Sequence, residues 1–382
     1  MKPIIFFLII LTCSFLTPQY IDNNQYPPGI DWRYIDTAKF RIVFPSEITD
    51  EGQRVANLLE YIYPKISSGR SSGKKITLFL PNSGIFSNGY VQLAPWKSEF
   101  FSTPPQSGFL GNLEWYSALA LHEGKHVDQF NLLNRGFTRF GGAIFGELGR
   151  AFFSFLSVPA WFWEGEAVNT ETIFSAGGRG RLPSFSMSTR AILLAGEKYK
   201  YIKSYLSSYK DHIPDIYRLG YFLTSYLKNR YTDKTIENIL DHSSSYSFYP
   251  FIFSRALKKG TGMGVEQLYN KVMDDLDQKW ALIDKELQLT DFQKINISPR
   301  KSWTQYTSPK EIEGGYIVAQ KYGLSHPLSL VKISPEGDEK KITEIYSVGH
   351  INNSLSVNNN KIVWSEPVKD LRWGKRSYSE VI

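Results

Sequence analysis

Two histidines four residues apart flank a glutamate in the segment ALALHEGKHVDQF, residues 118–130. The flanking residues are mainly apolar, which predicts a helix buried inside a domain. Positions i and i+4 share one face of a helix, so His122 and His126 can direct two imidazoles at one point. Glu123 would then lie beside the metal and act as general base on its bound water in the hydrolysis of a peptide bond. The spacing therefore predicts a catalytic zinc site.

Three further glutamates, Glu164, Glu166 and Glu171, follow in PAWFWEGEAVNTE, residues 159–171. Carboxylates in an apolar segment are costly unless they bind a metal or are paired. A helix starting near Pro159 would carry Glu164 in its first turns and Glu171 on the same face, where Glu171 would orient a histidine ring. Glu166 would point elsewhere and leave metal binding nearly unchanged. An independent third ligand would exclude the alternative that residues 118–130 form a solvated surface helix.

The secondary-structure patterns of the sequence change twice along the chain, which predicts an α+β fold with a β-rich end. Short strand patterns occur at 39–44, 75–80 and 86–95, with an amphipathic helix at 50–66 between the first two. The patterns from about 113 to 289 are mostly helical. After about residue 290, short strands alternate with turn residues, as in an antiparallel meander. About ninety residues of this kind supply little more than one blade of a propeller, whereas closed propellers need about four.

The first twenty residues have the pattern of a secretory signal peptide, in which an apolar run from Ile4 to Leu11 follows one lysine. This run is too short to span a bilayer. Cys13 is the only cysteine, so no disulfide is expected; a lipid anchor at Cys13 is the rival interpretation, disfavoured by Thr12 before it. We expect export to the periplasm or cell envelope, with possible envelope or outer-membrane association. The net charge of +7 is scattered, which does not favour nucleic acid as a partner.

The pairing of HEGKH with the later W-x-W-E-G-x-A resembles the gluzincin superfamily of zinc metallopeptidases. The segments DWRYIDTAKFRIVFP, SNGYVQLAP, HEGKHVDQF, WEGEAVNTETIFSAGGRGRLPSF and YRLGY, followed by a β-rich tail, resemble exported bacterial proteins that join a peptidase-MA-like domain to a TolB-like β-propeller. The resemblance implies a signal peptide at 1–20, a zincin-like peptidase domain at 21–292, with a small N-terminal sheet and then mainly helices, and the first part of a propeller at 293–382.

When the residue roles of the family are carried over position by position, the resemblance implies that His122 and His126 are the histidine ligands of Zn2+. It likewise implies that Glu164 is the third ligand and Glu123 the general base. Thirty-seven residues separate His126 from Glu164, more than in aminopeptidase-type gluzincins. An inserted helix or loop around residues 135–157 would absorb the difference.

Other segments offer weaker candidates. Tyr217 and Tyr221 lie one turn apart, and either could stabilise the oxyanion or simply pack in the core. The strand at 86–95 could be a sheet edge that pairs with an extended substrate or an ordinary edge. The loop GGRGR, residues 177–181, could hold an anionic group, although a solvated loop is favoured. The remaining histidines with no partner spacing receive no role: His242, His326 and His350.

These patterns together predict an exported zinc metallohydrolase that acts on a peptide or protein substrate, with the oligomeric state left open. A binding protein from a different class is the first alternative: its metallopeptidase-like domain would be a silent scaffold and its propeller would recognise the partner. A metal-stabilised structural component of the envelope, without turnover, is the second.

Overall fold

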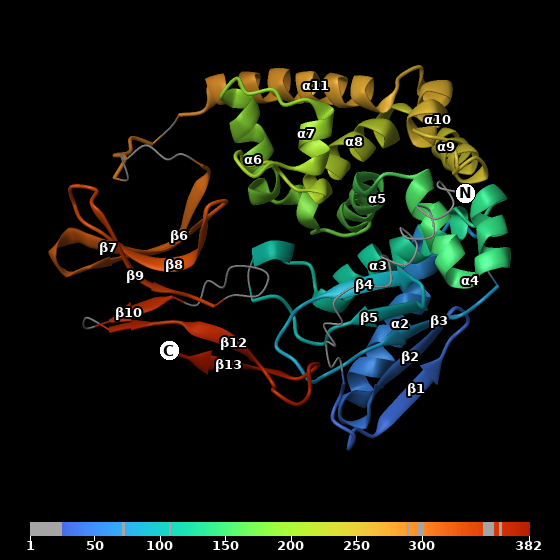
Figure 1. The fold of residues 1–382 in the computed structure, drawn as a ribbon, viewed down its shortest axis with the longest axis horizontal. Coiled ribbons are helices and arrows are strands. Elements are labelled where there is room, and N and C mark those ends of the chain that lie inside the picture. The colour runs from blue at the N-terminus through green and yellow to red at the C-terminus, as the bar shows by residue number, and fades with distance from the viewer. Residues whose placement is uncertain are drawn as a thin grey trace, which may run out of the picture.

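The computed structural model describes residues 25–70, 73–106, 108–288, 290–295, 302–346, 355–358 and 361–382. The predicted signal peptide, Cys13 and His350 lie outside these residues. The chain has a mixed α+β fold, as the sequence predicts, in which a small sheet is followed by helices and then by a β-rich tail (Figure 1). Among the helices described, none is long and apolar enough to cross a membrane.

The N-terminal sheet has the strand order β1-β2-β3-β5-β4, formed by β1 (Trp32–Asp36), β2 (Phe40–Pro45), β3 (Ile76–Phe79), β5 (Trp96–Phe100) and β4 (Gly89–Leu93). The strands β2, β3 and β5 run parallel, whereas β1 and β4 are antiparallel edges. Alternate residues of β2 point into a core that the helix α2 (Thr49–Ile66) covers. The predicted helix and three predicted strands are confirmed; β1 and β5 were not predicted.

The middle of the chain is helical, which confirms the prediction for residues 113–289. The helices are α3 (Trp115–Leu132), α4 (Gly136–Ser157), α5 (Ala160–Ile173), α6 (Pro183–Leu194), α7 (Tyr201–Leu206), α8 (Ile216–Arg230), α9 (Asp233–Ser245), α10 (Ile252–Thr261) and α11 (Val265–Glu286). The described residues also contain the 3-10 turns η1 (Ser46–Ile48) before α2, η2 (Gly108–Leu110) before α3, η3 (Arg179–Arg181) after α5 and η4 (Glu313–Gly315) in the tail. The insertion expected around 135–157 is the helix α4 (Figure 1).

Two glycines allow α5 and α8 to cross in backbone contact. A Cβ atom on Gly165 would lie 2.1 Å from the carbonyl carbon of Gly220, and one on Gly220 would lie 1.9 Å from the carbonyl oxygen of Trp161. No side chain fits in this space. The glycine that follows Glu164 in the sequence motif therefore lets α8 approach the helix that carries that glutamate.

The tail forms an antiparallel meander and two hairpins, which confirms the β-rich prediction. The meander consists of β6 (Thr304–Ile312), β7 (Tyr316–Gly323), β8 (His326–Ile333) and β9 (Glu339–Glu344). The hairpins pair β10 (Ser356–Asn358) with β11 (Lys361–Val363) and β12 (Ser365–Lys369) with β13 (Ser377–Val381).

The last hairpin is tied to the N-terminal sheet by polar contacts. The ammonium of Lys375 lies 3.2 Å from the buried carboxylate of Glu99 on β5. The hydroxyl of Ser377 accepts a hydrogen bond from the backbone N–H of Ile85. These contacts hold the tail against the loop that leads into β4.

Candidate metal centre

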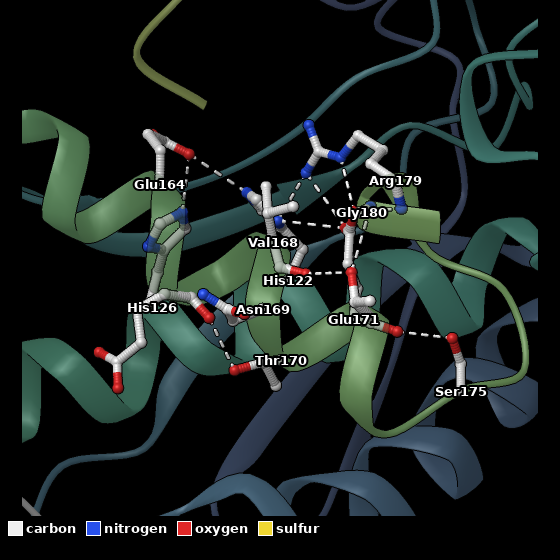
Figure 2. A network of polar contacts seen from close by, with 12 residues as sticks. His122, His126, Glu164, Val168, Asn169, Thr170, Glu171, Ser175, Arg179 and Gly180 are labelled. Atoms are coloured by element: carbon white, nitrogen blue, oxygen red, sulfur yellow. Dashed lines mark hydrogen bonds and ion pairs between the residues drawn. The ribbon is translucent and has the colours of Figure 1, made fainter. Parts of the chain in front are cut away.

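Helices α3 and α5 bring His122, His126 and Glu164 into one group, in which one possible ligand atom from each residue lies within 4.8 Å of the others. A carboxylate oxygen of Glu164 lies 3.3 Å from Nε2 of His122 and 3.5 Å from Nε2 of His126. Figure 2 shows the carboxylate of Glu164 directed at both rings. It is the one cluster in the described residues that could hold a metal ion.

The two helices are fixed in place by their ends and their packing. The side chain of Glu114 caps α3 by accepting hydrogen bonds from the backbone N–H groups of Tyr116 and Ser117. Leu119 and Val127 of α3 pack into the core beneath the sheet. Since α3 is buried on nearly all sides, its polar residues face the protein interior and not solvent.

The carboxylate and the two imidazoles of the group shift one another's pKa values. Burial alone would raise the pKa of Glu164, but His126 and His122 hold it well below its usual range. Burial would lower the pKa of His126, yet the carboxylate of Glu164 raises it to about 9. Two imidazoles and one carboxylate form a donor set typical of catalytic zinc. The residues present therefore fit a zinc ion.

Glu123 lies beside this group with an unsatisfied oxygen. Its side chain is buried, and its Oε2 atom has no hydrogen-bond partner in the described structure. Burial raises the pKa of this carboxyl group. A buried carboxylate oxygen without a partner is costly, so it indicates a place prepared for a water, a substrate or an ion.

Glu171 and Arg179 contact the ring of His122 at Nδ1, whereas Glu164 contacts it at Nε2. The guanidinium of Arg179 lies 2.7 Å from Nδ1 of His122, and a carboxylate oxygen of Glu171 lies 3.4 Å from the same atom (Figure 2). Burial would raise the pKa of Glu171, but Arg179 lowers it to about 2. The structure thus places Glu171 against the histidine ring, where the sequence expects it.

The solvated interpretation of the GGRGR loop is wrong for Arg179, which is only 6% exposed. Its guanidinium and backbone N–H all donate to Glu171. Arg181 of the same loop donates to the backbone carbonyl of Thr172. The buried carboxylate of Glu171 draws the loop inward, which the loop's own composition does not reveal.

Gln129 supports His126 in the same way, and the sequence analysis missed it. Its Oε1 atom lies 2.8 Å from Nδ1 of His126, while its amide nitrogen donates to the carbonyl of Trp163 and to Glu166. Glu166 does face away from the ligand group, as expected, but it contacts the residue that contacts His126. The position of Gln129, three residues after His126 and so on a neighbouring helical position, was the available signal.

The buried carboxylate of Glu166 is compensated by two ammonium groups. Lys125 and Lys228 each lie 3.3 Å from its Oε1 atom. Burial would raise the pKa of Glu166, but these lysines lower it to about 2.

Of the two candidate tyrosines, only Tyr217 reaches the group. Its ring stacks on that of His122, with centroids 6.2 Å apart. It lines a cleft together with Asn88, Gly89, His122, Glu123 and Arg179. The hydroxyl of Tyr221 instead donates to the carbonyl of Gly180, and its ring packs against Phe185. The structure therefore gives Tyr221 a packing role.

The edge strand β4 lies against the motif helix. A Cβ atom on Gly89 would lie 2.4 Å from the side chain of Leu119 and 3.3 Å from Oε1 of Glu123. Glycine at this position lets the strand pass close to the carboxylate. Asn88 and Gly89, where β4 begins, thus both line the cleft.

The other described histidines lie elsewhere in the fold. His242 belongs to α9, His326 begins β8, and His212 stacks on Trp303 at the start of the tail. Comparison with models of known protein families and with curated proteins finds no match for this chain. Its function is therefore inferred from the geometry and chemistry of the site itself.

Proposed function

We propose that this chain is a zinc-dependent hydrolase of gluzincin type that cleaves peptide bonds. One observation carries the proposal: the partnerless carboxylate oxygen of Glu123 lies beside a His-His-Glu group on the wall of a cleft. A site built only to hold a structural metal requires the three ligands but does not require Glu123. A buried and unsatisfied carboxylate is a stability cost that a catalytic role explains.

His122, His126 and Glu164 would hold the zinc ion. When bound, zinc supplies Lewis acidity, which polarises a carbonyl group and lowers the pKa of water. The raised pKa of Glu123, caused by burial, brings this carboxylate closer to neutral pH, where it can accept a proton from the attacking water. It can then return the proton to the leaving amine. The hydroxyl of Tyr217 borders the same cleft and would donate to the oxyanion.

The strand β4 favours an extended peptide as the substrate. It is the last strand of its sheet, so its outer edge has no neighbouring strand of that sheet. Its first residue, Gly89, lines the cleft next to Glu123. A peptide could add to this edge by backbone hydrogen bonds and place one carbonyl at the metal. In this proposal the β-rich tail is the first part of a propeller that governs access, and the protein acts outside the cytoplasm.

The Glu123→Gln variant tests the proposal. We expect it to bind one zinc ion per chain and to keep its fold, because the amide has nearly the same shape, but to lose peptide hydrolysis because it cannot accept a proton. Metal analysis and turnover on a broad peptide library measure the two effects. Turnover close to that of the wild type in Glu123→Gln contradicts the mechanism. A wild-type protein that binds zinc but cleaves no peptide supports the silent scaffold or structural alternatives instead.

A further inference from the structure

The inserted helix α4 is a hairpin of two helical arms. The backbone of Gly146 leaves the helical region, with φ 64° and ψ −151°, and divides the segment into arms 136–145 and 147–157. The arms pack closely: a Cβ atom on Gly149 would lie 2.2 Å from the carbonyl oxygen of Gly141. Since α4 carries none of the ligands of the metal centre, the residues inserted between His126 and Glu164 need another explanation.

The outer surface of this hairpin is apolar. At its tip, Phe145 and Leu148 are 66% and 74% exposed. The exposed apolar side chains of the hairpin are Phe137, Phe140, Ile144, Phe145, Leu148, Phe152, Phe155 and Leu156. Single exposed apolar residues are ordinary on protein surfaces, but a contiguous group of this size marks a surface that binds something apolar.

A second exposed segment extends this surface. The rings of Phe137 and Phe248 lie 4.2 Å apart, and the ring of Phe248 lies 4.3 Å from that of Tyr249. Phe251, at the end of the same turn, is 83% exposed. We call α4 together with the turn at residues 246–251 the aromatic face.

Two charged residues near the tip of the hairpin turn inward. The carboxylate of Glu147 accepts a hydrogen bond of 3.0 Å from the backbone N–H of Trp96, and the guanidinium of Arg150 lies 5.0 Å from the Trp96 ring. Arg150 is buried. Both groups anchor the hairpin to the start of β5, so neither charge lies on the exposed apolar tip.

The exposed charged residues of α4 and α10 are basic. They are Arg139 within α4 and Arg255, Lys258 and Lys259 on α10, which starts directly after the turn. None of these four forms an ion pair within the described part of the chain. A symmetric contact with a second copy would bring these like charges face to face. Anionic lipid headgroups would instead complement them, at roughly 1 kcal/mol for each basic residue near the surface.

We propose that the aromatic face docks into the surface of an anionic lipid bilayer, with the tip of the hairpin inserted into one leaflet. Each arm, at about 1.5 Å per residue, is roughly 15 Å long. This length reaches about halfway through a hydrocarbon core of about 30 Å, so the hairpin enters the bilayer without crossing it. The inference does not depend on the proposed hydrolase activity.

A fluorescent probe at the tip tests this proposal in the full chain. Cys13→Ser removes the only native cysteine, and Phe145→Cys then carries an environment-sensitive fluorophore. Leu282→Cys on α11, also well exposed, is the matched control. With vesicles of phosphatidylglycerol and phosphatidylcholine, we expect a blue shift at position 145 and quenching by spin-labelled lipid, with neither change at position 282. A site-specific probe reports insertion of the hairpin whatever the N-terminal apolar segment does.

Two further measurements sharpen the test. Adding Ile144→Ser and Leu148→Ser to the labelled protein should reduce the blue-shifted fraction at a fixed lipid concentration at least about tenfold. Vesicles of phosphatidylcholine alone should bind more weakly than anionic ones. An unchanged probe at position 145 on anionic vesicles overturns the proposal. A blue shift without lipid that grows with protein concentration, together with a doubled mass, overturns it in favour of a second copy.

Discussion

Helices α4 and α5 follow one another in the chain and depart from the usual distribution of side chains in opposite directions. Helix α5 buries polar and charged residues, among them Glu166, Asn169 and Glu171. Helix α4 exposes large apolar residues, such as Phe145 and Leu148, while its Arg150 is buried. Buried polar groups and large exposed apolar patches are the two informative exceptions to the rule that apolar residues lie inside.

The two helices differ in what offsets the cost of the buried polar groups of α5 and of the exposed apolar residues of α4. Every buried carboxylate of α5 has a cation or an amide against it, as Arg179 pairs with Glu171 and Lys125 with Glu166. These partners are part of the protein, so α5 is satisfied except for the position of the metal. The apolar face of α4 has no comparable cover within the described residues, so whatever offsets its exposure lies outside them. Helix α4 thus indicates a partner at its surface, and helix α5 indicates a ligand in the interior.

The largest expected effect comes from removing Glu164, the residue of α5 that would bind the metal. Removing a direct ligand by Glu164→Ala leaves two imidazoles, so zinc affinity should fall by at least about 1,000-fold, well beyond the 10- to 100-fold loss typical of an outer partner. His122→Ala and His126→Ala should have similar effects. Competition titration with a chromogenic chelator measures the affinities. A Glu164→Ala protein that keeps its zinc affinity would show that the third ligand lies elsewhere.

The second-largest expected effect is on stability and comes from the close backbone contact between α5 and α8. Gly165→Ala places a methyl group 2.1 Å from the backbone of Gly220, which cannot move without displacing α8. We expect a loss of about 3 kcal/mol in the free energy of unfolding, the upper range for overpacking. The matched change on α4, Phe145→Ser, removes an exposed ring and should stay within about 0.5 kcal/mol. Urea unfolding followed by circular dichroism compares the two; equal losses would mean that Phe145 is not exposed in solution.

Acid should destabilise the environment of α5 selectively. The pKa of Glu171 is lowered to about 2 from an ordinary value of 4.5. A lowered folded pKa means that the stabilisation is complete above pH 4.5 and is lost as the pH falls toward 2, by on the order of 3 kcal/mol. In the metal-free protein, Glu171→Gln should therefore flatten the acid limb of the stability profile between pH 4.5 and 2. Phe145→Ser should leave that limb unchanged, and a limb of wild-type slope in Glu171→Gln would contradict the role of this carboxylate.

Local spacing explains what the sequence predicts correctly here. Positions four apart on a helix set the pairing of His122 with His126, and apolar flanks predict that the helix is buried. Alternating strands predict three of the five strands of the sheet. The contact of Arg179 with Glu171 depends on a loop that folds back onto its own helix, and no pattern encodes it. The apolar segment of α4 has the composition of a core helix, and only its tertiary position shows that it is exposed.

The smallest expected effect concerns Glu166, which the sequence analysis expects to be silent. Its carboxylate accepts a hydrogen bond of 3.0 Å from the amide nitrogen of Gln129, and the carbonyl oxygen of the same amide faces Nδ1 of His126. Glu166 therefore holds Gln129 in the orientation that leaves Nε2 of His126 free for a metal. We expect Gln129→Leu to weaken zinc binding about 10- to 100-fold and Glu166→Gln to weaken it by less than about 10-fold.

A double-mutant cycle separates this indirect role from a general effect of the buried charge. If Glu166 acts through Gln129, then Glu166→Gln should have no further effect on zinc affinity once Gln129 is leucine. If the loss persists in that background, Glu166 acts on the site through its field or through the stability of α5. Unfolding free energies of the metal-free variants provide the control, because the pairing of Glu166 with Lys125 and Lys228 contributes to stability in either case. If Glu166→Gln changes zinc affinity in neither background, the buried carboxylate of Glu166 serves the fold alone, and the support of the metal is confined to Glu171 and Gln129.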